Sequence, residues 1–219
     1  MIEIFVSKFN NPELEKNCVE AILKHTTEPY HLTVYHNEKN ENQLKYSNYF
    51  VNKSKADYFI GLGSDTIVTE GWLDKIREAI EKESNWGFMS VMTDCGHPSQ
   101  QKEVLNYYQV DEMERLSGFC SIYPVEIYKK LGGLDENFQF WCSDMDYCWR
   151  VKKAGLRVLL LRNVFIKHLG SQSIRKEERE TGRDYNKMHL EDQEYFKNKW
   201  GLKGFWGVKY EDARNTANN

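Results

Sequence analysis

The stretch Asp57-Tyr58-Phe59-Ile60-Gly61-Leu62-Gly63-Ser64-Asp65 decides the fold class of this chain. Its apolar run predicts a buried strand over 57–62, and the glycines and polar residues after it predict a turn. Three further strand patterns and three helical patterns alternate with it, with strands at 2–6, 31–35 and 87–92 and helices at 12–25, 42–55 and 69–82. This alternation predicts an α/β fold with a mostly parallel, Rossmann-like sheet flanked by helices.

Polar residues follow three of these strands at their carboxyl ends. They are Ser7, the pair His36-Asn37 and the pair Ser64-Asp65. In open parallel sheets, ligands bind beyond the carboxyl ends of the strands. We therefore expect these residues to face one pocket.

The second half of the chain has a less regular pattern. Residues 94–117 predict a polar loop region with short helical stretches, and residues 170–188 are so polar that they predict a mobile segment. The regular elements expected there are strands at 118–123, 156–161 and 164–167 and helices at 124–131, 143–154 and 189–200.

Composition excludes several classes of protein. Lys and Arg number 30 against 33 Asp and Glu, so the net charge of −3 argues against a protein that binds the nucleic-acid backbone. The mean hydropathy is −0.71, and no apolar run approaches the ~18 residues that span a bilayer. The first residues carry no leader pattern. Five cysteines without a C-x-x-C pair predict free thiols. Together these features predict a cytoplasmic protein without a transmembrane segment.

The second informative stretch lies between residues 132 and 173. It comprises Gly132-Gly133-Leu134-Asp135-Glu136-Asn137-Phe138, Trp141-Cys142-Ser143-Asp144-Met145-Asp146, Arg150, Gly155, His168 and Ser173. Together with residues 57–65, this order and spacing resembles the family 2 glycosyltransferases of the GT-A fold. The resemblance covers about residues 1–201 and includes the ending Lys199-Trp200-Gly201.

The resemblance implies a domain organisation. A single GT-A domain would span residues 1–201, with its nucleotide-sugar-binding half at about 1–92. A smaller, acceptor-side and catalytic half would occupy 93–201, followed by a C-terminal tail at 202–219.

The resemblance also implies an activity. This is an inverting, non-processive transfer of the hexosyltransferase type. The sugar would pass from a nucleotide-diphosphate sugar, with a UDP-sugar as the expected donor, to an acceptor hydroxyl, assisted by Mn²⁺ or Mg²⁺. The departing diphosphate needs a cation or positive groups, and hard cations prefer oxygen ligands. Asp65 is the expected metal ligand, although an Asx-turn would also explain it. His168 matches a family His that ligates the cation or contacts the diphosphate, and a purely structural His is the alternative.

Contacts to the nucleotide sugar are expected from Ser7, Asn37, Asn48, Ser64, Asp65 and Ser173. Three positions depart from the family pattern. Gly63 stands where the first Asp of a D-x-D motif is usual, His36 replaces an Asp expected at the nucleoside, and Ser47 stands where a basic residue is frequent. These departures support a second hypothesis, a catalytically weak or inactive GT-A domain that serves as a nucleotide-sugar or carbohydrate-binding module.

Asp144 matches the family residue that acts as general base, which takes the proton of the attacking hydroxyl. A capping box formed by Ser143 and Asp146 would explain its neighbours without assigning Asp144 a role. Asp146 also has a helical partner in Arg150 four residues on. Trp141 is the candidate acceptor contact through ring stacking, with a place in the core as the alternative.

The acceptor and the partners stay open at this level. The acceptor could be a glycan, a lipid-linked glycan, a protein side chain or a modified nucleobase, and a homodimer is compatible with the sequence. Residues 170–188, which follow His168, could close over the donor as a lid. A third hypothesis, a nucleotidyltransferase, needs a Gly-rich basic loop after the first strand, and residues 7–11 lack it.

Overall fold

The computed structural model describes residues 1–8, 11–36, 42–170, 172–205 and 209–210. Its centre is an eight-stranded sheet in the order β2-β1-β3-β7-β5-β8-β4, with β6 paired to β8. The strands are β1 Ile2–Lys8, β2 His31–His36, β3 Tyr58–Gly63, β4 Thr66–Val68, β5 Trp86–Met92, β6 Val110–Glu112, β7 Cys120–Pro124 and β8 Arg157–His168. The helices are α1 Pro12–His25, α2 Gln43–Lys53, α3 Trp72–Lys82, α4 Val125–Lys130, α5 Ser143–Lys153, α6 Gln172–Thr181 and α7 Tyr185–Trp200, with a 3₁₀ helix at Pro98–Gln101.

The strand directions confirm the predicted α/β fold with a mostly parallel sheet. Strands β2, β1 and β3 are parallel neighbours, and β5 and β8 are parallel neighbours. Strand β7 lies between the two groups and is antiparallel to both β3 and β5. Because two antiparallel steps restore the direction, β5 runs the same way as β3.

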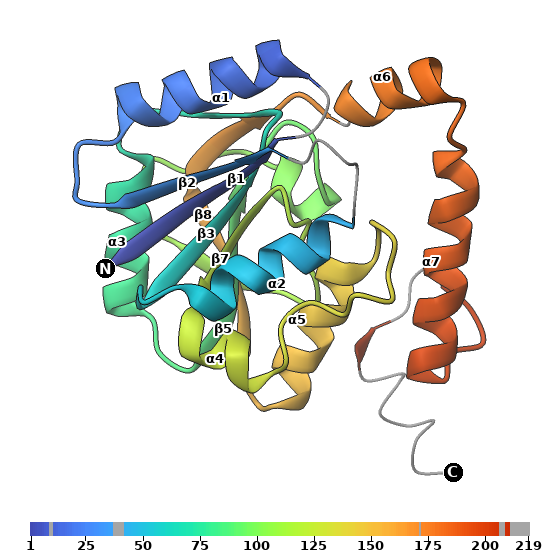
Figure 1. The fold of residues 1–219 in the computed structure, drawn as a ribbon. Coiled ribbons are helices and arrows are strands. Elements are labelled where there is room, and N and C mark those ends of the chain that lie inside the picture. The colour runs from blue at the N-terminus through green and yellow to red at the C-terminus, as the bar shows by residue number, and fades with distance from the viewer. Residues whose placement is uncertain (9–10, 37–41, 171, 206–208, 211–219) are drawn as a thin grey trace.

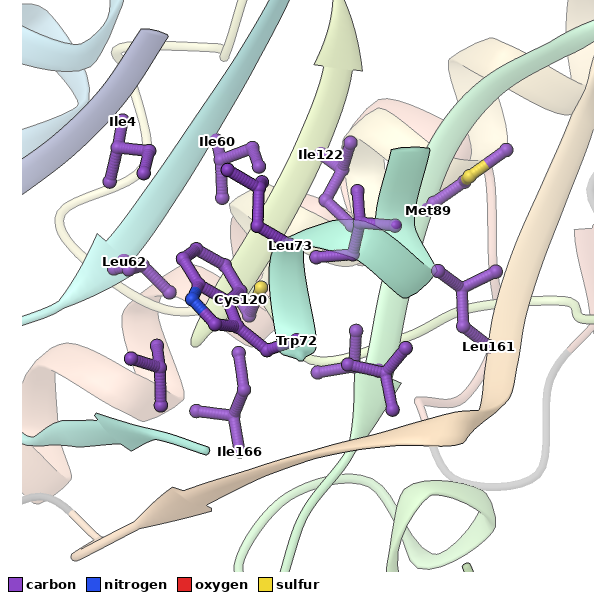
Figure 2. Packing of buried hydrophobic residues seen from close by; sticks show 14 of the residues in the cluster. Ile4, Ile60, Leu62, Trp72, Leu73, Met89, Cys120, Ile122, Leu161 and Ile166 are labelled. Carbon is purple, nitrogen blue, oxygen red and sulfur yellow. The ribbon is translucent and has the colours of Figure 1, made fainter. Parts of the chain in front are cut away.

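Apolar residues on the two faces of the sheet form two cores. Helices α1 and α3 cover one face, and helices α2, α4 and α5 cover the other (Figure 1). On the first face, Trp72 and Leu73 of α3 lie over strand residues such as Ile60 and Ile122 (Figure 2). The Trp72 indole also donates to the Thr26 hydroxyl at 2.9 Å, so its polar atom is satisfied inside the core. The second core continues onto α7 through Phe196.

The structure corrects the sequence expectations in the second half of the chain. The strands predicted at 156–161 and 164–167 are one strand, β8, and the polar loop region contains the short strand β6. The short strand β4, which pairs with β8, was not predicted either. Three-residue pairings of this kind depend on a distant partner strand, and local periodicity carries no sign of them.

The segment 170–188, which the sequence predicted to be mobile, contains regular structure in its described residues. Helix α6 and the first turn of α7 occupy most of it, and both run along one side of the molecule (Figure 1). Their apolar residues Ile174, Tyr185 and Met188 are buried in a small third core with Phe140 and Trp141. Three apolar side chains, one from α6 and two from α7, therefore pack a segment that is otherwise polar.

No helix in the described parts of the chain is long and apolar enough to cross a membrane. The described cysteines are all free, as predicted, and four of the five are buried. The described end of the C-terminal tail also packs onto the domain, since the ring of Tyr210 lies 6.1 Å from that of Trp149.

Candidate active site

A cavity of about 480 Å³ opens at the carboxyl ends of β1 and β3 and reaches the start of α5. This is the edge of the sheet where the sequence placed a ligand pocket. Most of the predicted site residues line this cavity, namely Ser7, Ser64, Asp65, Trp141, Asp144, His168 and Ser173. The cavity therefore brings together residues that are up to 166 positions apart, Ser7 and Ser173.

Asp65 and His168 form a pair at one side of the cavity. Strand β4 pairs with β8 so that Thr66 lies opposite His168, which brings the turn containing Asp65 to the end of β8. Asp65 Oδ2 lies 3.4 Å from His168 Nε2. His168 Nδ1 donates to the Cys95 carbonyl, and the His168 backbone N–H donates to Asp94 Oδ1 at 2.8 Å. The imidazole thus has a partner at each ring nitrogen, and Asp94 fixes the backbone of the same residue.

The protonation of His168 is governed by opposing effects. Burial by itself lowers its pKa, but the hydrogen bond and the negative charge of Asp65 raise it more. The pKa of His168 consequently lies above the ordinary value for a histidine. Because Nδ1 donates to a carbonyl, Nε2 is the nitrogen that faces Asp65 and is able to bind a cation.

Gly63 decides how the Asp65 carboxylate lies. A Cβ atom at position 63 would be 2.8 Å from Asp65 Oδ1, so only glycine lets the carboxylate fold back over the end of β3. The Asp65 carboxylate therefore lies close to Gly63, the position where the family that the sequence resembles usually has its first Asp. In the described residues, no cluster of three or more His, Cys, Asp or Glu could hold a metal ion on its own. One carboxylate and one imidazole fit a cation whose other ligands are diphosphate oxygens and water.

Two serine hydroxyls in the cavity wall have unused hydrogen-bonding capacity. Ser7 and Ser173 are only 3% and 7% exposed. Within the part of the chain that the structure describes, neither hydroxyl has a hydrogen-bond partner. Buried polar groups are almost always paired in folded proteins, so both hydroxyls point to a ligand that would satisfy them.

Asp144 lies in the first turn of α5, at the other side of the cavity. Its Oδ1 accepts from the Met145 N–H at 2.7 Å and its Oδ2 accepts from the Gly118 N–H at 3.0 Å. Burial raises the pKa of Asp144, and these backbone donors and the nearby Arg115 only partly oppose the shift. A carboxylate of raised pKa at the edge of a cavity is suited to accept a proton near neutral pH.

A buried glutamine holds the loop that contacts Asp144. Gln100 is fully buried, and its Oε1 accepts from the Ser117 N–H at 2.8 Å while its Nε2 donates to Ser90 Oγ at 3.0 Å and to the Val91 carbonyl at 3.1 Å. Sequence reasoning missed Gln100 because it lies in an aperiodic polar stretch and its partners come from other segments.

The start of α5 is fixed by charges and not by the capping box considered above. Its N-cap is Cys142, with φ at 63° and no side-chain cap hydrogen bond. The buried carboxylate of Asp146 instead accepts from Arg150 Nε at 2.8 Å, as its spacing predicted. It also accepts from Trp200 Nε1 at 3.0 Å and lies 2.7 Å from Lys199 Nζ. The Lys-Trp-Gly ending of the domain thus anchors the helix that carries Asp144.

Trp141 lies between the cavity and the small third core. It lines the cavity, and its ring also contacts Tyr185 and His189 with centroids 5.7 and 5.1 Å apart. The buried carboxylate of Asp192 on α7 accepts from the N–H groups of residues 139, 140 and 141 at 2.8, 2.9 and 2.8 Å. Asp192, which sequence reasoning also missed, therefore fixes the loop that presents Trp141.

One predicted donor contact, Asn48, does not line the cavity. Asn48 Oδ1 accepts from the Leu134 N–H and the Tyr128 hydroxyl, and its Nδ2 donates to the Leu134 carbonyl and to Glu136. Asn48 thus pins α2 to the turn after Gly133, and all its hydrogen-bonding groups are used there. Asn37 lies outside the described residues.

Comparison with known proteins agrees with this geometry. Residues 10–132 match the model of glycosyl transferase family 2, and the chain belongs to that family. The matched residues end before Asp144. No curated protein sequence matches the chain.

Solved structures show the same fold at low sequence identity. GalNAc-T7, crystallised with UDP, GalNAc and Mn²⁺, has a TM-score of 0.63 and 11% identity over 77% of this chain and 43% of its own length. Residues 1–349 of S. aureus TarS have a TM-score of 0.62 and 12% identity over 96% of this chain and 76% of theirs. This chain therefore spans less than half the length of the GalNAc-T7 chain.

Proposed function

We propose that this protein is an inverting, non-processive hexosyltransferase that moves a sugar from a UDP-sugar to an acceptor hydroxyl. The observation that carries the proposal is that Asp144 and the pair of Asp65 and His168 line one cavity. In the described residues, Asp65 and Asp144 are the acidic side chains of that cavity. Asp65 is engaged with His168, which leaves one carboxylate to act as a base.

On the donor side, Asp65 and His168 would hold a divalent cation, Mn²⁺ or Mg²⁺, together with the diphosphate. When bound, the cation supplies positive charge that stabilises the departing diphosphate. The unpaired hydroxyls of Ser7 and Ser173 would donate to the donor, and Ser64 lies buried beside them. GalNAc-T7, which shares the fold, was crystallised with UDP and Mn²⁺, and this supports the choice of donor and metal.

On the acceptor side, Asp144 would accept the proton of the attacking hydroxyl. With one base and no second carboxylate free to attack the sugar, a single displacement follows, and a single displacement inverts the anomeric centre. The raised pKa of Asp144 suits this step because the base must hold the proton once the bond has formed. The indole of Trp141 offers an apolar face for the acceptor at the edge of the cavity.

One observation favours the second candidate, a binding module without turnover. Gly63 removes a carboxylate from the D-x-D position, so the protein supplies few charges to a cation. The two candidates differ in one measurable property, the release of UDP. With a UDP-sugar and Mn²⁺, a transferase slowly transfers the sugar to water and so produces UDP, and it produces UDP faster with a suitable acceptor. A binding module binds the UDP-sugar and produces no UDP from it.

A further inference from the structure

A glycine in the middle of β3 leaves open space inside the cavity. Gly61 pairs with Phe5 of β1 and with Ser121 of β7. A Cβ atom at position 61 would meet nothing closer than the Ser121 carbonyl at 4.0 Å. Gly61 is not among the glycines with positive φ, so its backbone does not require glycine. A strand-centre glycine without a conformational reason indicates close approach of another molecule.

The space above Gly61 is walled mainly by apolar parts of side chains. We call it the recess, and its walls are Phe5, Val51, Phe59, Tyr123, Tyr128 and Leu134, with Ser121 beside Gly61. The Tyr128 hydroxyl donates to Asn48 Oδ1 at 2.6 Å and the Ser121 hydroxyl donates to the Gly118 carbonyl at 3.0 Å, so neither donates to a ligand. A sugar hydroxyl inside the recess would exchange its hydrogen bonds to water for at most one bond to the Ser121 oxygen, whereas a methyl group would gain apolar contacts.

A polar group stands at the mouth of the recess. Ser7 lies two residues after Phe5, on the same face of β1. In the β1–β3 pairing, Phe5 lies opposite Gly61 and Ser7 lies opposite Gly63. The step between these two pairs is about 7 Å along the strand. The Ser7 hydroxyl is buried and without a partner among the described residues. Along the cavity, the Ser7 hydroxyl is therefore followed by the recess, at a separation that a short substituent of a sugar could span.

This order identifies the substituent that fits. An acetamido group carries an amide, which Ser7 could hydrogen-bond, and a methyl group, which the recess would bury. The mouth adjoins Gly63, which lies two residues before Asp65 on the side assigned to the diphosphate, so we assign the recess to the donor sugar. We propose that the recess above Gly61 binds the acetamido group of the transferred sugar and selects a 2-acetamido-hexose donor. This inference rests on the proposed function.

Matched sugars test the inference by isothermal titration calorimetry with Mn²⁺. UDP-N-acetylglucosamine and UDP-glucose differ in the acetamido group, as do UDP-N-acetylgalactosamine and UDP-galactose. We expect the acetamido member of one pair to bind about tenfold tighter or more, since apolar pockets discriminate small groups to about this extent. Gly61→Ala should abolish this preference and keep the affinity for UDP, and Gly61→Val should exclude the acetamido sugar.

The variants are expected to fold because the added Cβ meets open space. Thermal unfolding checks this, and Gly61→Ala should not lower the melting temperature. Ser7→Ala should reduce the preference without filling the recess. Equal binding of both members of each pair would overturn the inference, as would a Gly61→Ala variant that weakens UDP and UDP-sugars alike. A Gly61→Ala variant that instead raises only the KM for acceptor would assign the recess to the acceptor. Failure of UDP itself to bind would defeat the proposed function, a result distinct from lost selectivity.

Discussion

The carboxylate of Asp144 accepts a hydrogen bond from the backbone N–H of Gly118 at 3.0 Å. This contact joins the first turn of α5 to the loop that enters β7, and it holds the proposed base at the cavity edge. The space around it is tight, since a Cβ atom at Gly118 would lie 3.2 Å from Asp144 Cβ and 3.2 Å from Ser121 Oγ. The position of the base thus depends on a small residue in a loop 26 positions away.

Asp144→Asn tests the role of the base. The amide keeps the shape of the side chain but cannot take the proton, so we expect transfer to fall by ~10²–10⁴-fold. Affinity for UDP should stay within a few-fold, because Asp144 is not among the residues assigned to the nucleotide and its diphosphate. Asp74→Asn, on α3 at the opposite face of the sheet, is the matched control and should leave transfer unchanged. Turnover of the Asp144 variant at the rate of the native protein would remove this residue from the mechanism.

The pH dependence of transfer should reveal the environment of Asp144. Its pKa is raised by burial, and the base must be ionised, so activity should fall as pH decreases through that raised value. Gln100→Met should loosen the loop at Ser117 and weaken the Gly118 donor, which stabilises the ionised form. The acidic limb of the kcat profile should then move to higher pH. A reduced rate with an unmoved limb would show that Gln100 acts on stability alone.

Asp65→Asn tests the cation site. In the presence of Mn²⁺ we expect the affinity for UDP to fall by about tenfold or more, which corresponds to roughly 1.4 kcal/mol of binding free energy. With the metal chelated, the native protein and the variant should bind UDP with similar, weak affinity. Titration calorimetry with Mn²⁺ and with EDTA gives both values. An equal loss of UDP affinity with Mn²⁺ and with EDTA would indicate that Asp65 contacts the nucleotide and not a metal ion.

Asn48 illustrates why part of the site escaped sequence reasoning. A buried amide that pairs with backbone groups 86 residues away is indistinguishable in sequence from one that binds a ligand. Asp65, Asp144 and His168 were found because their spacing to glycines and strand ends is local. Gln100 and Asp192 were missed because each is a single polar residue whose partners are distant. The antiparallel direction of β7 likewise depends on the path of residues 93–119, where no periodicity exists.

Asn48→Ala should therefore destabilise the fold without affecting the donor. It leaves the buried Tyr128 hydroxyl without its acceptor, and it leaves the Leu134 N–H with only the Tyr128 hydroxyl oxygen at 3.3 Å. Each orphaned group costs about 1–3 kcal/mol, so the free energy of unfolding in urea should fall by at least that amount. The folded fraction should bind UDP with native affinity. A variant of native stability that binds UDP weakly would restore Asn48 to the donor site.

Ile174→Asp tests whether α6 is held by its small core or ordered only by a donor. Ile174 is buried with Tyr185 and Met188 against Phe140 and Trp141, so a carboxylate there should detach α6. Ser173, the neighbouring residue, would leave the cavity wall, and affinity for UDP should fall.

Leu190→Asp is the matched control, because Leu190 is 65% exposed on α7 and should tolerate the same charge. Hydrogen exchange across residues 172–188 measures the outcome without nucleotide. The native protein and the Leu190 variant should show protection there, and the Ile174 variant should not. Fast exchange of this segment in the native protein, slowed only by UDP and Mn²⁺, would contradict packing by the small core and favour closure on the donor. Protection without nucleotide would mean that Ser173 is already in place when the diphosphate binds. The packing of α6 would then have offset the entropy cost of ordering this segment before binding.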